Sequence, residues 1–296
     1  MLALDELFRV RGCQNLDPGE LQISDIDPVM DSKFKLGEVA AAAHASVGVG
    51  VNDIWELKTG RRQKIQISVR SAAASLKSNK FIEIRQRNGE YQKLVDKDHE
   101  FNRQLNGIYR SKDGRWVLPH FGLNHLRDRM LSLLEACPDQ SSISKAVLKW
   151  DAIDLENAIA ELNLCGGMVR GNSEWLAEPH GKVLSKKPVI EIIKIGESDP
   201  EPIPISSRPL GGVRVLDLTR ILAGPIAART LAEHGADVLM VTAENLPQVH
   251  AYVADTSHGK RSCFVDIKEN EGARKLKDLI IGADIFSQGY RPGAME

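Results

Sequence analysis

The sequence PLGGVRVLDLTRILAGPIAARTLAEHGADVLMV, residues 209–241, decides the fold of the carboxyl-terminal part of the chain. Residues 213–218 form a short, mostly apolar run with the length and β-branched content of a buried strand. A helix is expected over residues 226–234, with Pro225 at its first position and Gly235 just after its end. Residues 237–241 predict a second buried strand. This order predicts a β-α-β unit of a parallel sheet.

The glycines of this stretch do not match a dinucleotide-binding fingerprint. In G-x-G-x-x-G sites the glycines follow the first strand and open the helix. Gly211 and Gly212 precede the strand here, and only one tight turn follows it. An ordinary NAD site is therefore not expected. The helix N-terminus can still face an anion with its free N–H groups, which leaves another phosphate-bearing ligand open.

Several motifs in this region carry a resemblance to a known family. They are PLGGVRVLDLTRILAGPIAARTLAEHGADV, then HGKRSCFVDIKENEGARKLKDLIIGADIF, then QGYRPG, in order over residues 209–293. Together they resemble the amino-terminal third of the family III CoA-transferases, which include formyl-CoA transferase, the carnitine CoA-transferase group and the α-methylacyl-CoA racemases. The resemblance implies an α/β protein with a Rossmann-like parallel-sheet part and a smaller, helix-rich α+β domain.

A second match lies earlier in the chain. Residues 36–76, LGEVAAAAHASVGVGVNDIWELKTGRRQKIQISVRSAAASL, resemble the middle of the same family, where a nucleophilic aspartate starts a long helix that ends in K-T-G-x-G-Q. We expect a helix over residues 36–57, a strand over 64–69 and a helix over 71–81. In the family this segment follows the one at 209–293, whereas here it precedes it. The resemblance thus implies a tandem arrangement in which the chain is a fragment that stops early in a second unit.

The expected organisation has five parts. They are an N-terminal helix and lead-in at 1–30, a helix–strand–helix segment at 31–105, a small domain with a return segment at 106–196, a Pro-rich linker at 197–208, and the Rossmann-like start of a second unit at 209–296.

The small domain and its return segment have their own local patterns. A hairpin turning at Asp113-Gly114 is followed by amphipathic helices over 126–136, 143–150 and 155–164. Residues 189–195 are expected to form a strand.

Composition limits the possible functions. The chain has 296 residues, 42% of them hydrophobic, and a net charge of −1, which favours neither a nucleic-acid partner nor a membrane surface. No run approaches the ~18 apolar residues of a membrane-spanning helix. Four distant cysteines (Cys13, Cys137, Cys165 and Cys263) lack metal-ligand spacing, so no metal site is expected. Free thiols favour a reducing compartment, and we expect a cytoplasmic protein.

The resemblance assigns one catalytic candidate. Family enzymes attack the acyl-CoA thioester with an aspartate, and alignment on Lys58-Thr59-Gly60 places Glu38 at that position. Glutamate is one methylene longer, and positioning of a nucleophile tolerates little displacement. The alternative is that Glu38 only stabilises the N-terminus of its helix. His44 lies six positions later and points to another side, so we expect it to be a packed residue rather than a proton-transfer partner.

The resemblance also implies contacts to CoA near the second motif group. The candidate residues are Leu222, Ala223 and Gly224 in the turn, Lys260 and Arg261 at the family's N-K-R-S stretch, and Tyr290 and Arg291 at its E-N-F-x-P-G stretch. Tyr290 replaces the family's Phe and Gly289 its Asn. Lys260 and Arg261 have an equally simple interpretation as a solvated pair before a strand.

The function implied by the resemblance is transfer of CoA from an acyl-CoA to a carboxylic acid through a carboxylate-bound anhydride and thioester. The alternatives are an acyl-CoA racemase or epimerase, and a non-catalytic CoA-binding half. CoA is then a substrate, and no permanently bound cofactor is expected. The assembly is expected to be a homodimer or a single pseudo-dimeric chain.

Overall fold

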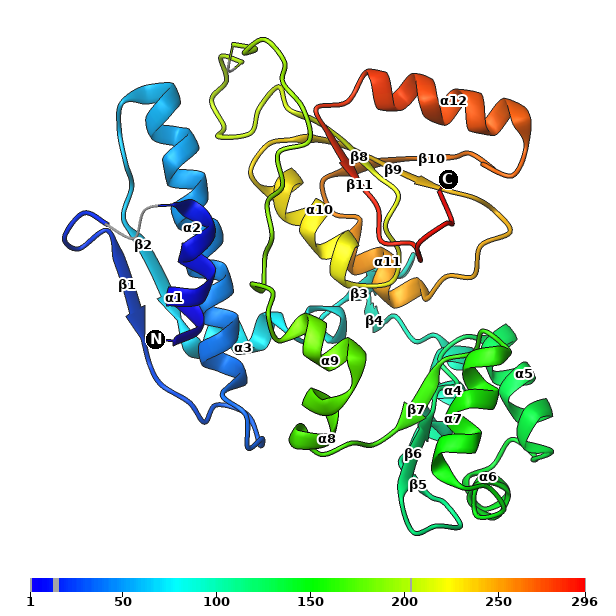
Figure 1. Cartoon of the computed structure of the whole chain (residues 1–296). Helices are drawn as coiled ribbons and strands as arrows, with labels where there is room; N and C mark the ends of the chain where they lie inside the picture. The colour runs from blue at the N-terminus through cyan, green and yellow to red at the C-terminus, as the bar shows by residue number, and fades with distance from the viewer. Residues whose placement is uncertain (1, 13–15, 203, 296) are drawn as a thin grey trace. The chain divides into compact units, whose positions relative to one another are not determined.

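The computed structural model describes residues 2–12, 16–202 and 204–295 (Figure 1). Cys13 lies outside these residues. The chain divides into two compact units: Met1–Leu94 together with Pro188–Glu296, and Val95–Lys187. The second unit begins and ends earlier along the chain than the small domain expected at 106–196.

A four-stranded parallel sheet organises the carboxyl-terminal part of the first unit. Its strands are β8 (Arg214–Asp217), β9 (Asp237–Thr242), β10 (Lys260–Phe264) and β11 (Ile285–Ser287), in the spatial order β10-β9-β8-β11. Val215 of β8 lies opposite Val238 of β9 and Ile285 of β11. The β-α-β unit predicted from residues 209–241 is therefore confirmed.

Helices cover both faces of this sheet. α10 (Ala223–Glu233) and α11 (His250–Thr256) lie on one face and α12 (Asn270–Ile281) on the other (Figure 1). Side chains alternate accordingly, because successive residues of a strand point to opposite faces. Val215 and Val238 pack with Ala228 and Ala232 of α10. Leu216, Leu218 and Val241 pack with Leu276 of α12.

The amino-terminal part of the first unit is built around one long helix. Its elements are α1 (Leu2–Phe8), a 3-10 turn η1 (Arg9–Arg11), β1 (Leu21–Ser24), α2 (Leu36–Thr59), β2 (Ile65–Ser68), α3 (Val69–Ser75), a 3-10 turn η2 (Ser78–Lys80), β3 (Glu83–Arg85) and β4 (Tyr91–Lys93). β1 and β2 pair in parallel, and β3 and β4 form a hairpin. Gly60 ends α2 in the left-handed region, at φ 68°, and donates its N–H to Glu56 O.

The second unit has its own core. It contains α4 (Lys97–Leu105), β5 (Tyr109–Arg110), β6 (Trp116–Pro119), α5 (Asn124–Leu134), α6 (Gln140–Val147), α7 (Ala152–Glu161), β7 (Gly166–Met168), α8 (Asn172–Ala177) and α9 (Pro179–Leu184). The strands form an antiparallel sheet in the order β5-β6-β7. Phe121, Met130, Ile143 and Leu155 are fully buried at its centre. The hairpin expected around Asp113-Gly114 and the three expected helices are present.

Three local expectations were wrong. Residues 189–195 form no strand and lie exposed, because no neighbouring strand among the described residues pairs with them. The helix after β8 begins at Ala223, so Pro225 is its third residue; the first-turn N–H groups lack helical partners, and proline is tolerated there. The helix expected over 71–81 is α3 followed by the short turn η2.

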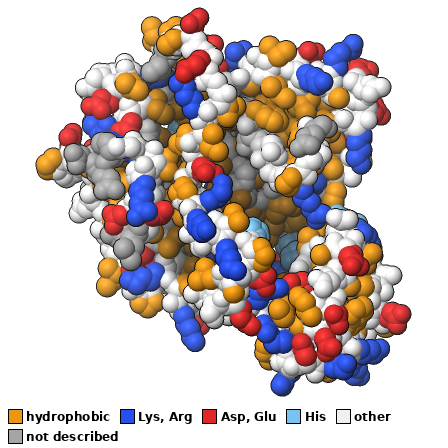
Figure 2. All heavy atoms as spheres, in the orientation of Figure 1, with side chains coloured by type: hydrophobic (Ala, Val, Ile, Leu, Met, Phe, Trp, Pro, Cys, Tyr) orange, Lys and Arg blue, Asp and Glu red, His pale blue; other side chains and the backbone are white. Residues whose placement is uncertain are grey.

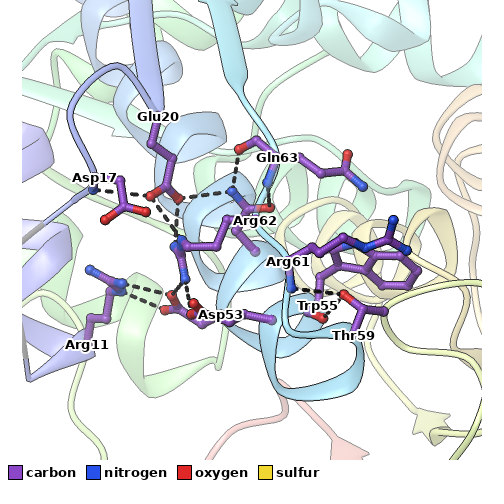
Figure 3. A network of polar contacts seen from close by, with 11 residues as sticks. Arg11, Asp17, Glu20, Asp53, Trp55, Thr59, Arg61, Arg62 and Gln63 are labelled. Carbon is purple, nitrogen blue, oxygen red and sulfur yellow. Dashed lines mark hydrogen bonds and ion pairs between the residues drawn. The ribbon is translucent and has the colours of Figure 1, made fainter.

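A network of charges holds the amino-terminal elements together (Figure 3). The guanidinium of Arg62 donates to both oxygens of Glu20, at 2.6 and 3.0 Å, and to Asp53 Oδ1 at 2.9 Å. Arg11 binds the same Asp53 carboxylate with two hydrogen bonds, at 2.6 and 2.8 Å. The hydrogen bonds from Arg62 lower the pKa of Glu20, and those from Arg11 lower the pKa of Asp53. The loop before β1, helix α2 and the segment before β2 are thereby joined.

Replacing Arg62 with Met is expected to lower the free energy of unfolding by about 3 kcal/mol at neutral pH, because Glu20, whose side chain is 3% exposed, then stays buried without its cation. The stabilisation by Glu20 is present above its unfolded pKa, near 4.5, and is lost as the pH falls through the lowered folded value. The difference between variant and wild type, measured by urea unfolding, should therefore shrink in acid. Arg61→Met is the matched control. Equal losses for the two variants would contradict the assignment.

Candidate functional site

The carboxyl ends of the parallel strands define the edge where a ligand is expected. β8 leads to α10 on one face of the sheet, whereas β11 is reached through α12 on the other face. From β8 the chain runs outward to β9 and β10 and then returns to β11 on the other side of β8. In open α/β sheets, ligands bind beyond the carboxyl ends of the strands at such a reversal of strand order.

A pocket of about 300 Å³ lies at this edge. Its apolar wall includes Leu218, Val241, Val265 and Ile267, which follow or end three different strands, and Tyr290 closes it from the segment after β11.

The polar residues that line the same pocket include Asn245, Asp266 and Lys268, the three rim residues. Asn245 Nδ2 donates to Asp266 Oδ2 at 3.1 Å, and the backbone N–H of Lys268 donates to Asp266 Oδ1 at 3.0 Å. No hydrogen bond or ion pair engages the Lys268 ammonium in the part of the chain that the structure describes. The pocket therefore combines an apolar wall with an available cation, a combination suited to a ligand with an apolar body and an anionic group.

A buried ion pair fixes the loop after β8. Lys260 Nζ lies 2.9 Å from Asp217 Oδ2 and donates to Pro225 O at 2.8 Å. The other carboxylate oxygen, Asp217 Oδ1, accepts the N–H of Thr219 at 2.9 Å and also its hydroxyl. The side chains of Lys260 and Asp217 are 1% and 0% exposed. Burial lowers the pKa of Lys260, against the effect of Asp217, which favours the charged ammonium.

The same loop is sterically demanding. Ile221 has φ of 70°, a left-handed conformation that β-branched residues rarely adopt. Gly224 packs against Thr219 so closely that an added Cβ would lie 2.3 Å from Thr219 Cβ. α10 then starts at Ala223 with no side-chain cap at Leu222 among the described residues. Its first N–H groups therefore face the edge of the sheet without a side-chain acceptor.

The structure brings some of the sequence-predicted residues together and separates others. Leu222, Ala223 and Gly224 lie at the carboxyl edge, and Tyr290 lines the pocket there. Arg291 is exposed in the turn that follows Tyr290.

The two basic residues of the N-K-R-S match lie at the amino end of β10, away from the pocket-lining residues that follow this strand. Arg261 is exposed there and pairs with Asp237, its Nε donating to Oδ1 at 3.1 Å. Lys260 turns inward and its ammonium is enclosed. Neither interpretation offered by the sequence, a phosphate contact or a solvated pair, describes the position of Lys260.

Glu38 lies in the first turn of α2, where the alignment places it. Its Oε1 is 3.1 Å from Lys35 Nζ. The backbone N–H groups of Gly37 and Glu38 donate to the Asp27 carboxylate, at 3.2 and 2.7 Å. The N-terminus of α2 therefore already holds a carboxylate. His44 Nε2 lies 2.8 Å from Ser75 Oγ, with no bond to Glu38.

Sequence reasoning missed Asp27 and the three rim residues of the pocket. Asn245, Asp266 and Lys268 come directly after β9 and β10, and a search of the residues that follow each expected strand would have found them. Asp27 lies ten residues before Gly37, and no local spacing signals that contact.

The described residues show neither a metal-binding cluster nor a membrane-spanning helix. No group of three or more His, Cys, Asp or Glu side chains is arranged to hold a metal ion. No helix among these residues combines the length and apolar character needed to cross a bilayer. Figure 2 shows basic and acidic side chains interspersed over the described part of one face, in keeping with the net charge of −1.

The parallel sheet, with helices on both faces and a pocket at its carboxyl edge, defines an α/β protein. Comparison with known proteins shows a family match in this region: residues 210–296 match the model of CoA-transferase family III.

Curated relatives extend the match. The chain is 28% identical to the acetyl-coenzyme A transferase nodX of Hypoxylon pulicicidum over 308 residues, covering 92% of this chain and 52% of that protein. It is 29% identical to an acyl-CoA transferase of Gibberella moniliformis, covering 90% and 52%. The succinyl-CoA:glutarate CoA-transferase of Mus musculus is 37% identical over 102 residues, covering 30% and 23%. The chain spans about half the length of the two fungal relatives.

Gly224→Ala is expected to destabilise the chain by about 2 kcal/mol, because the new methyl group overlaps Thr219 and forces the loop to shift. Gly289→Ala is the matched control, since nothing lies within 4 Å of its added Cβ. Urea unfolding of both variants tests this contact. Similar stability of the two variants would show that the loop is looser than the structure indicates.

Proposed function

We propose that the chain takes part in the transfer of CoA from an acyl-CoA to a carboxylic acid, and that residues 209–296 form its CoA-binding part. The observation that carries the proposal is the pocket at the carboxyl ends of β8, β9 and β10. The names of the relatives, all transferases of CoA or acyl-CoA groups, support the reaction class.

The chemistry of CoA fits the residues of this edge. Its adenine is a flat aromatic ring whose faces suit the apolar wall and the Tyr290 ring, because aromatic faces stack favourably. The phosphates of CoA suit the Lys268 ammonium. The exposed guanidinium of Arg291, the residue after Tyr290, is a second candidate for a phosphate contact. The turn at Leu222, Ala223 and Gly224 would border the rest of the ligand with backbone groups. CoA is a substrate in this proposal.

The second step of the proposal concerns the reacting carboxylate. Acyl transfer needs a carboxylate nucleophile and donors that stabilise the oxyanion. Glu38 has the aligned position, but its carboxylate is engaged by Lys35, and the neighbouring N–H groups are occupied by Asp27. This geometry favours the alternative of a CoA-binding half whose reacting carboxylate lies elsewhere in the protein. The racemase alternative has no support from His44, whose partner is Ser75.

The tandem arrangement is also a proposal. The two fungal relatives match this chain in one continuous order over about nine-tenths of its length, which supports the view that the unusual segment order is a feature of this group. A tandem protein would contain in one pseudo-symmetric chain the two units that a homodimer brings together. Mass measurement of the assembly distinguishes a single chain from a homodimer.

The first test is CoA binding by calorimetry. Tyr290→Ala is expected to weaken the binding of CoA about tenfold, because it removes an aromatic wall of the pocket. Tyr91→Ala is the matched control, since Tyr91 is 65% exposed on β4 and lies outside the pocket lining. Loss of affinity in the control alone, or no binding by the wild-type chain, would overturn the proposed site.

The second test addresses Glu38. The chain is incubated with an acyl-CoA, trapped with hydroxylamine and analysed by mass spectrometry, with Glu38→Gln as the control. We expect no hydroxamate on Glu38, because its carboxylate is paired and the helix N-terminus is filled by Asp27. A hydroxamate that forms on Glu38 and vanishes in the variant would make the amino-terminal segment a catalytic site.

A further inference from the structure

The loop between β8 and α10 is bound at both ends by one side chain. Lys260 Nζ holds Asp217, just before the loop, and Pro225 O, just after it. The carboxylate of Asp217 in turn fixes Thr219, the second residue after β8. Lys260 itself belongs to β10, which is separated from β8 by β9. One ammonium group thus joins two strands and the first turn of α10.

The loop needs such a restraint because its conformation is intrinsically unfavourable. Ile221 is in the left-handed region, and conformations of this kind persist only where the surroundings over-determine them. Gly224 also lies so close to Thr219 that no residue with a side chain fits at position 224. A buried charge is an effective restraint, since electrostatic interactions strengthen where water is excluded.

We propose that Lys260 is a positioning residue that fixes the loop at residues 219–224 in the conformation that borders CoA, and that it makes no contact with the ligand. The CoA-binding part of this inference rests on the proposed function. The position of Lys260 differs in kind from that of Lys268, whose ammonium is available at the pocket rim. One lysine shapes the site and the other is placed to meet a phosphate.

The first experiment measures the loop without any ligand. Lys260→Met removes the ammonium and keeps an unbranched apolar stem. Hydrogen exchange should become at least tenfold faster at the N–H groups of Thr219 and Ile226, which bond to Asp217 Oδ1 and Leu222 O, while the amides of β9 keep their protection. Arg261→Met, at the next position and exposed, is the control. Unchanged exchange at Thr219 and Ile226 in Lys260→Met would overturn the proposal.

A second variant separates a local effect on the loop from a general loss of stability. Asp217→Asn combined with Lys260→Met removes both buried charges while leaving an acceptor for the Thr219 N–H, and removal of both members of a buried pair is often tolerated. Faster exchange at Ile226 in a double variant with wild-type Tm would show that the loop depends on Lys260 apart from global stability. Wild-type exchange at Ile226 in that variant would contradict the positioning role.

The third experiment compares CoA with 3′-dephospho-CoA by calorimetry. A positioning residue affects the binding of both ligands through the loop. Lys260→Met should therefore lower the affinity for CoA and for 3′-dephospho-CoA by the same factor, about tenfold. Weaker binding of CoA alone would identify a direct phosphate contact and overturn the inference. If the wild-type chain binds neither ligand, the proposed function fails, while the exchange experiment still decides the role of Lys260.

Discussion

The buried ion pair between Asp217 and Lys260 is the interaction on which the carboxyl-terminal part of the structure depends. Taking two charges out of water costs several kcal/mol per ion, and the fold must compensate with good geometry and further hydrogen bonds. Both oxygens of Asp217 and the ammonium of Lys260 have such partners, in Thr219 and Pro225. Asp217 lies on β8, Lys260 on β10, Thr219 in the loop after β8 and Pro225 on α10, so the pair is satisfied only when the sheet order, the loop and the helix are all in place.

The amino-terminal part follows the same principle with different residues. Arg62 and Arg11 neutralise Glu20 and Asp53, and α2 cannot shift without leaving one of these carboxylates unpaired. The buried carboxylate of Asp255, on α11, accepts from Arg229 at 2.9 Å and from Ser78 at 2.6 Å. Ser78 comes from the amino-terminal part and Arg229 from α10. Polar contacts of this kind specify one arrangement where apolar packing alone would tolerate several.

The spacing of apolar residues and the positions of glycine and proline predicted the helices, which satisfy their own hydrogen bonds, and the strands whose partner is close in sequence. The strands of the β-α-β unit and the helix over 36–57 are examples, since each combines an apolar pattern with a clear end. The strand expected at residues 189–195 failed because a strand needs a partner, which a local pattern does not supply. Lys260 and Arg261 are adjacent in one motif, yet alternation along β10 turns the first into the interior and the second to solvent. Their roles depend on the face that each residue occupies, and one sequence does not fix that face in an edge strand.

The starts of α2 and α10 differ in a way that favours the carboxyl-terminal sheet as the candidate site. Every helix start presents N–H groups that lack helical partners and attract an anion. At α2 these groups are satisfied internally by Asp27, so a ligand would have to displace a carboxylate that is part of the chain. At α10 no side chain of the described residues caps the start, and the pocket with its apolar wall and Lys268 lies at the carboxyl edge of the same sheet. An anionic ligand would therefore gain interactions at α10 that it could obtain at α2 only in exchange for those of Asp27.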